Sequence, residues 1–165
     1  IPIIMYNVPG RTGCNILPTT MAELAKHKNI CGMKEASGNI PQVTEMARRM
    51  PDDFYLMSGN DDMVVPLLSV GGVAVISVVA NIVPKDTHNM VKYYLDGKVK
   101  EARDLQLSMK PLIDALFCET NPIPIKTAMN LMGKEVGLLR LPLVEMEEKN
   151  LNLLKQRMQE YGLMD

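Results

Sequence analysis

Several residue types that mark specialised classes of protein are scarce in this sequence. It has no tryptophan and two histidines, and His27 and His88 have no metal-binding partner at a useful spacing. The three cysteines, Cys14, Cys31 and Cys118, are odd in number and match no zinc-binding pattern. This cysteine usage is typical of free thiols in a reducing cytoplasm, where we expect the protein to reside without a bound metal.

Long apolar runs and clusters of charge of one sign are also missing. The longest apolar stretches, such as Val73–Ala80, are too short to cross a bilayer as a helix, and the opening residues do not resemble a signal peptide. With 18 basic and 19 acidic residues, the net charge is −1 and no basic patch indicates nucleic-acid binding. We therefore expect a globular protein that binds neither nucleic acid nor a membrane.

What the chain does contain is 14 methionines and 47% hydrophobic residues, which favours a core filled largely by flexible thioether side chains. Its 165 residues suffice for one sizeable core or for a piece of a larger domain. The sequence opens without an initiator methionine, on residues 1–8 that have the pattern of a buried strand. This opening favours a fragment whose first part is missing.

Apolar runs and amphipathic segments alternate over the first hundred residues. Strands are predicted at 1–8, 30–34, 54–58 and 73–80, and helices at 18–26, 41–50, 61–69 and 84–95. Strands that are apolar on both faces indicate a parallel sheet covered by helices, either half of a (β/α)8 barrel or a small doubly wound sheet. In a barrel, Ile4, Met33, Met57 and Val75, or their immediate strand neighbours, are expected to face the interior.

After Gly97 the pattern becomes purely helical, with helices predicted at 99–117, 123–132 and 145–161. We therefore expect two domains. Residues 1–97 form the α/β part, and residues 98–165 form a C-terminal helical domain.

Three residues with chemical potential lie at successive strand ends. Tyr6, Lys34 and Gly59 are separated by 28 and 25 residues, about one βα unit each. Because the carboxyl ends of parallel barrel strands open at one mouth, these positions are expected to converge there. Lys34 follows an apolar run, and desolvation favours the neutral amine that attacks a carbonyl to form an imine. The alternative is a lysine that extends to water, beside Glu35.

Tyr6 is a candidate proton relay or, alternatively, a strand-end aromatic that covers the core. Arg11, in a loop between glycines, is a candidate for binding a substrate carboxylate or, alternatively, a solvated charge. The turn Ser37-Gly38-Asn39 is compatible with an anion site, but a plain helix cap by Asn39 is the preferred interpretation.

The motifs around these residues resemble those of the dihydrodipicolinate synthase family, within the wider superfamily of class I pyruvate aldolases and N-acetylneuraminate lyases. The likeness extends over essentially the whole chain, with the motifs in family order. They are Tyr6-Asn7-Val8-Pro9-Gly10-Arg11-Thr12-Gly13, Gly32-Met33-Lys34-Glu35-Ala36-Ser37-Gly38-Asn39, Leu56–Asp62, Gly72–Asn81, Asn121-Pro122-Ile123-Pro124-Ile125-Lys126 and Leu139-Arg140-Leu141-Pro142.

The resemblance implies the C-terminal half of a TIM barrel followed by a helical domain. It implies that Lys34 forms a Schiff base with pyruvate, that Tyr6 relays protons and that Arg11 binds the carboxylate of L-aspartate 4-semialdehyde. Gly59 and Ile76 would line the pyruvate pocket, largely through backbone groups. The implied product is 4-hydroxy-tetrahydrodipicolinate, on the route to diaminopimelate and lysine. No cofactor is implied, because the protonated imine is the electron sink.

The resemblance also implies partners that this chain lacks. In the family the tyrosine works with a threonine and a second tyrosine from the first half of the barrel, and members are commonly homotetramers. We therefore expect the chain alone to be incomplete for catalysis and to need its N-terminal half. Two alternatives stay open: a sugar-acid aldolase of the same superfamily, or a non-catalytic assembly module.

Overall fold

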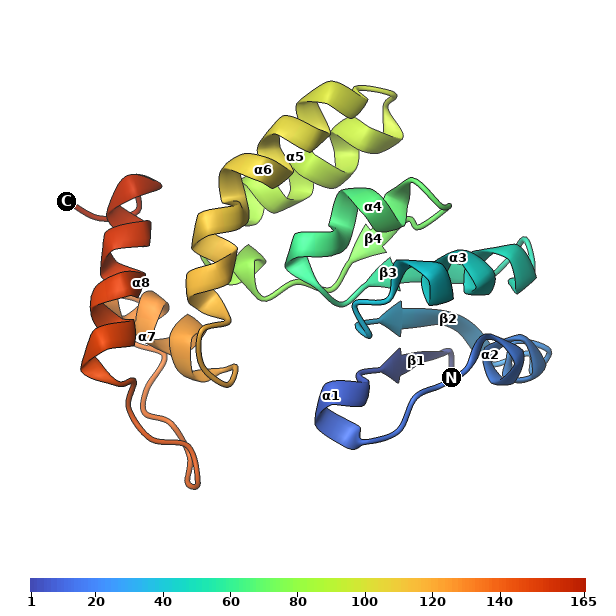
Figure 1. The fold of residues 1–165 in the computed structure, drawn as a ribbon, viewed down its shortest axis with the longest axis horizontal. Helices are drawn as coiled ribbons and strands as arrows, with labels where there is room; N and C mark the ends of the chain where they lie inside the picture. Colours follow the sequence, from blue (N-terminus) through green and yellow to red (C-terminus); the bar gives the residue numbers. More distant parts are fainter.

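The computed structural model describes all 165 residues and contains one four-stranded sheet flanked by helices (Figure 1). The strands are β1 (Ile3–Asn7), β2 (Ile30–Glu35), β3 (Tyr55–Ser58) and β4 (Ala74–Val75). All three neighbouring pairs are parallel, and the strands adjoin in chain order, β1-β2-β3-β4. Helices carry the connections between the strands, as parallel pairing requires and as the alternating sequence pattern predicted.

The helical segments follow the sequence pattern closely in most places. Helix α5 occupies the predicted residues, and Asn39 caps α3 as expected, its Oδ1 accepting a hydrogen bond from the Gln42 amide at 3.1 Å. In chain order the segments are α1 (Pro9–Thr12), α2 (Pro18–Leu24), α3 (Ile40–Arg49), η1 (Asp61–Met63), α4 (Val64–Leu68), η2 (Val79–Asn81), α5 (Pro84–Leu95), α6 (Val99–Leu116), α7 (Ile123–Leu131) and α8 (Glu148–Glu160).

Two predictions about local structure were wrong. The strand predicted over residues 73–80 is confined to Ala74–Val75, because the chain then turns into η2, where Asp61 accepts hydrogen bonds from the Val78 and Val79 amides. The segment after β1, predicted as a loop, contains the short helix α1. Neither feature has a hydrophobic period long enough to be detected in a sequence.

The two faces of the sheet differ in burial. The prediction named four inward-facing side chains or their immediate strand neighbours, and at Met33 and Val75 it is the neighbours that face the interior. Met33 is fully buried with Met5 and Leu56 in a core cluster that includes residues of α2 and α3, and Val75 packs toward α4 and α5. Their strand neighbours occupy the other face, where Ile4 and Tyr55 are 46% and 55% exposed. Because these strands are apolar on both sides, alternation in the sequence could not assign the faces.

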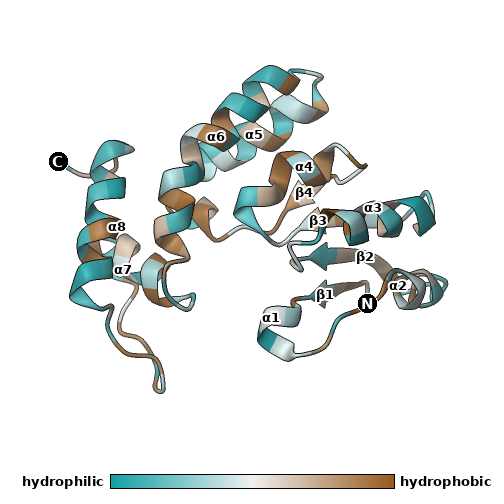
Figure 2. Ribbon diagram, in the orientation of Figure 1, coloured by the Kyte–Doolittle hydropathy of each residue, from teal (hydrophilic) through white to brown (hydrophobic).

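A second core joins the end of the α/β part to the C-terminal helices. Met109 and Leu116 of α6 pack with Leu154 and Met158 of α8, and Val79 of η2 belongs to the same buried cluster. Helix α4 is the most uniformly hydrophobic of the sheet-covering helices, as Figure 2 shows, and its buried residues pack between β3, β4 and α5. None of the helices combines the length and the apolar character that a membrane crossing needs.

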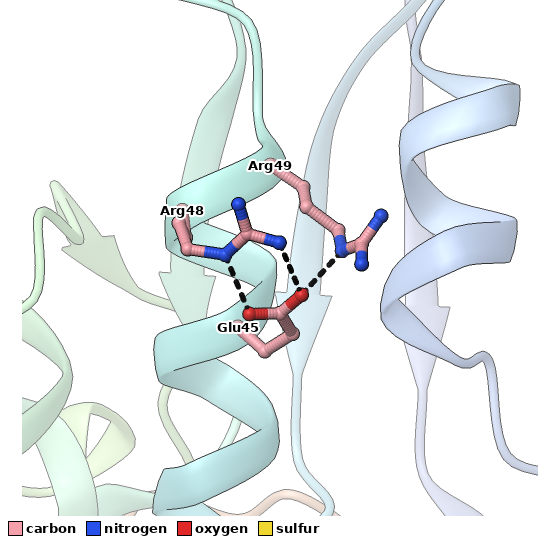
Figure 3. Close-up of polar contacts among 3 residues, drawn as sticks. All are labelled: Glu45, Arg48 and Arg49. Atoms are coloured by element: carbon pink, nitrogen blue, oxygen red, sulfur yellow. Dashed lines mark hydrogen bonds and ion pairs between the residues drawn. The ribbon is translucent and has the colours of Figure 1, made fainter.

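The exposed side of α3 carries a small ionic cluster (Figure 3). Glu45 accepts hydrogen bonds from Arg48 at 2.7 and 2.6 Å and from Arg49 at 2.5 Å. The two guanidinium groups hold the pKa of Glu45 down at about 2. Both arginines lie in the last turn of the helix, where positive charge interacts favourably with the helix dipole.

Candidate active site at the strand ends

The carboxyl ends of the four strands are held side by side by backbone hydrogen bonds that continue the sheet beyond its regular residues. The amide of Ala36 donates to the carbonyl of Asn7 at 2.9 Å, that of Gly59 to Glu35 at 2.7 Å, and that of Ile76 to Ser58 at 2.8 Å. The predicted convergence of residues one βα unit apart is therefore confirmed. In Figure 1 the arrowheads of β1 and β2 point toward the side on which α7 and α8 lie.

Lys34 and Tyr6 are directly opposite each other in the pairing of β1 with β2. The Lys34 Nζ lies 4.0 Å from the centroid of the Tyr6 ring, within the range of a cation–π contact. Gly59 adjoins the lysine stem so closely that a Cβ atom there would lie 3.0 Å from Lys34 Cε and 2.8 Å from Ala36 Cβ. The space for the lysine side chain thus depends on the absence of a side chain at position 59.

These residues line a cavity of about 370 Å³. Its only charged side chains are those of Lys34 and Arg11, so the cavity is cationic and contains no carboxylate. Such a site suits a small anionic ligand. All five residues singled out in the sequence lie in this lining, which consists of Tyr6, Val8, Arg11, Lys34, Ala36, Gly59, Asn60, Ile76, Ser77, Val78, Phe117 and Asn121.

Arg11 comes from α1 and connects the strand ends to the helical part of the chain. Its Nη1 donates a hydrogen bond of 3.3 Å to the backbone carbonyl of Asn121, 110 residues away in the sequence. Asn121 and Phe117, from the connection between α6 and α7, form one wall of the cavity. Sequence reasoning missed both as site residues because they follow no strand. The only available signal was the motif Asn121–Lys126.

Asp61 is a third residue near the site that the sequence did not single out. It is 2% exposed, and its Oδ2 accepts hydrogen bonds from the amides of Val78 and Val79 at 2.9 and 3.1 Å. Burial raises the pKa of this carboxyl, while those two amides act in the opposite direction. Asp61 lies two residues after Gly59, and Val78 lies two residues after Ile76, so these hydrogen bonds connect the two loops that form this side of the cavity.

Known proteins with similar sequences and the same fold identify the class of this structure. The chain superposes on dihydrodipicolinate synthase from Thermotoga maritima with a TM-score of 0.97 and 45% sequence identity, over 99% of this chain and 57% of that one. A monomeric dihydrodipicolinate synthase variant gives a TM-score of 0.94 with 44% identity, over 99% and 56%. The fold is thus the second part of a TIM barrel followed by a C-terminal helical region.

The model of the dihydrodipicolinate synthetase family matches residues 1–161, and the chain belongs to this family. A 4-hydroxy-tetrahydrodipicolinate synthase of Thermoanaerobacter sp. (strain X514) is 59% identical over 99% of this chain and 56% of the relative. The corresponding synthase of Caldicellulosiruptor saccharolyticus is 60% identical over 99% and 55%. The chain therefore spans about half the length of the curated relatives it matches.

Proposed function

We propose that this chain carries the imine-forming half of a synthase that condenses pyruvate with L-aspartate 4-semialdehyde to give 4-hydroxy-tetrahydrodipicolinate, in the biosynthesis of diaminopimelate and lysine. One observation carries the proposal: Lys34 lies beside Tyr6 in a cavity whose only charges are the two cations Lys34 and Arg11. Both proposed substrates are carboxylates, so this charge complements them. The named activity of the curated relatives supports the choice of reaction.

In the proposed mechanism, the ammonium of Lys34 first gives up one proton, and the resulting neutral amine attacks the ketone carbon of pyruvate. Loss of one water leaves the imine, and return of that proton to its nitrogen gives the protonated imine. Removal of a methyl proton converts the imine to an enamine, whose carbon attacks the aldehyde of the second substrate. Tyr6 would relay protons at the nitrogen, and the contact of its ring with Nζ supports this role. The imine nitrogen accepts the electron pair in these steps, so the scheme needs no metal or organic cofactor.

The other three residues are assigned to binding. Gly59 and Ile76 would form the pyruvate part of the cavity, chiefly through backbone groups. Arg11 would bind the carboxylate of the semialdehyde through a charge-assisted hydrogen bond. The carbonyl of Asn121 accepts from one end of the guanidinium, which fixes its direction and leaves other N–H groups for the substrate.

We further infer that residues 1–165 need the rest of a barrel to form the complete site, with residues 1–97 contributing the barrel part and 98–165 the helical domain. The exposed inner face of the sheet supports this inference, since Ile4, Tyr6, Tyr55 and Ile76 are all more than 40% exposed there. The test compares residues 1–165 with and without the remaining barrel segment. A monodisperse 1–165 monomer that turns over substrate at the full enzyme's rate would contradict the inference.

The decisive experiment for the reaction is reductive trapping in the full-length protein. Pyruvate with borohydride should add the mass of pyruvic acid less one oxygen atom, and peptide mapping should locate it on Lys34. Lys34→Ala should abolish labelling and keep the fold, whereas Lys28→Ala, which removes an exposed lysine before β2, should label normally. A label on Lys28 or Lys85 with Lys34 unmodified would refute the assignment.

A further inference from the structure

A buried polar network lies behind the candidate site, on the opposite face of the strand ends from Lys34 and Tyr6. Asn7 and Glu35 are 1% and 2% exposed and are paired with each other in the sheet, one residue after the pair Tyr6 and Lys34. Because successive side chains of a strand point to opposite faces, these two lie directly behind the proposed catalytic pair.

The network uses both N–H groups and the carbonyl oxygen of the Asn7 side chain. Its Nδ2 donates one hydrogen to Glu35 Oε2 and the other to Asn15 Oδ1, both at 2.9 Å, and its Oδ1 accepts from the Ile16 amide at 2.9 Å. The second carboxylate oxygen, Glu35 Oε1, accepts from the Ser37 amide at 2.6 Å. The side chains of Asn7 and Glu35 therefore connect three segments: both strand ends and the loop that follows α1.

The carboxylate in this network has no partner cation. None of the ion pairs in the structure includes Glu35. A buried charge without a partner cation is costly, and a packed apolar side chain would stabilise the fold more cheaply. What a carboxylate offers here is two acceptors in one plane, which match the two donors on Asn7 and Ser37.

We propose that Asn7 and Glu35 are positioning residues for the reaction, a role that rests on the function proposed above. The hydrogen bonds of Glu35 to Asn7 and to the Ser37 amide hold the carboxyl end of β2 in place, so that Lys34 keeps its distance to Tyr6. The hydrogen bonds of Asn7 to the Asn15 side chain and the Ile16 amide hold residues 15 and 16 in place, and with them the C-terminal end of the segment that carries Arg11. Displacement of a reacting group by about 1 Å costs on the order of 100-fold in rate, so a rigid support on this face serves catalysis without contacting the substrate.

The test exploits the complementarity of donors and acceptors. In Glu35→Gln the amide must present an N–H to one of the two donors, Asn7 Nδ2 or the Ser37 amide. In Asn7→Asp two carboxylates face each other. In the double variant the Nε2 group at position 35 donates to the carboxylate at position 7, and the side-chain oxygen at position 35 still accepts from the Ser37 amide. The side-chain amide of Asn15 can turn over so that its N–H donates to the carboxylate at position 7. Gln42 turns over with it, because the two side chains already exchange hydrogen bonds.

In the full-length enzyme we expect each single variant to lower kcat/KM for condensation by about 10- to 100-fold and the double variant to recover to within about threefold of wild type. Glu35→Gln should act mainly on the rate of pyruvate trapping, and Asn7→Asp mainly on the KM for the semialdehyde. Amide hydrogen exchange at Ile16 and Ser37 should accelerate in the singles and slow again in the double, a readout independent of turnover.

Thr87→Val is the matched control, since Thr87 is buried and hydrogen-bonded within α5, away from the cavity. It should lower stability and leave kinetics unchanged at temperatures where all variants are folded. Single variants that are folded and kinetically normal would refute the positioning role, as would a double variant no faster than the singles. A wild-type enzyme that neither traps pyruvate nor condenses would instead contradict the proposed function.

Discussion

A single methyl group added at position 59 tests the geometry of the candidate site most directly. In Gly59→Ala the new Cβ would lie 2.8 Å from Ala36 Cβ, 3.0 Å from Lys34 Cε and 3.1 Å from Lys34 Cγ. Carbon atoms in contact prefer about 3.5–4.0 Å. The backbone holds Ala36 in place through its hydrogen bond to Asn7, so the flexible lysine stem must move by about 0.5–1 Å to restore normal contacts.

The size of the effect follows from these contacts. Overpacking of this kind costs about 1–3 kcal/mol in stability. The larger consequence is kinetic, because the displaced atoms carry the amine: a shift of about 1 Å in a reacting group costs on the order of 100-fold. We therefore expect Gly59→Ala to fold with modestly reduced stability and to trap pyruvate about 10- to 100-fold more slowly than wild type.

The assay is the rate of borohydride trapping by the full-length enzyme at saturating pyruvate, with unfolding by denaturant measured in parallel. Gly10→Ala is the matched control, since a Cβ there meets no atom within 4 Å. Gly32→Ala is the opposite control: its Cβ would lie 2.7 Å from the Tyr55 carbonyl oxygen, so it should lose stability through the sheet. A Gly59→Ala enzyme that traps pyruvate as fast as Gly10→Ala would refute the proposed position of Lys34.

Three further predictions concern other parts of the structure. Arg11→Ala should reduce kcat/KM for the semialdehyde by the equivalent of about 2–3 kcal/mol and leave pyruvate trapping nearly unchanged; equal losses for both would reassign Arg11 to loop structure. Burial raises the pKa of Asp61 above 3.8, so the wild-type protein should lose stability as the pH rises from about 4 through the folded-state pKa. Urea unfolding measured over this pH range should show no such loss for Asp61→Asn. Tyr161→Phe removes a 2.7 Å hydrogen bond to Asp86 and should lower the free energy of unfolding by about 1–2 kcal/mol; no change would mean that this contact between α8 and α5 is not stabilising.

The parts of this fold that the sequence predicted are those with a long, regular pattern. Helix α5, with proline at its start and Gly97 beyond its end, was located to the residue. The carboxyl ends of the first three strands were predicted to within one residue, because each apolar run stops where a polar or glycine residue begins the loop, whereas the fourth strand ends five residues earlier than predicted. The sequence could not show which face of the sheet carries Met33, because a strand that is apolar on both faces has no alternation of polar and apolar residues.

For the candidate site, too, the sequence predicted only the residues that belong to a regular pattern. Tyr6, Lys34 and Gly59 are related by the repeat of βα units, so their convergence could be predicted from spacing alone. Phe117 and Asn121 reach the cavity through the packing of α6 against the preceding units. Asp61 acts through a turn between β4 and η2 that depends on its own hydrogen bonds. Tertiary contacts of these two kinds leave no periodic signal in the sequence.

The hydrogen bond from Arg11 to the carbonyl of Asn121 has a consequence for how such chains can be recombined. A crossover at Gly97 looks harmless, because a turn separates the last barrel helix from the first helix of the tail. Yet the tail contributes Phe117 and Asn121 to the cavity wall and orients the arginine assigned to the second substrate. Chimeras that exchange residues 98–165 between relatives would therefore exchange part of the substrate preference along with the tail.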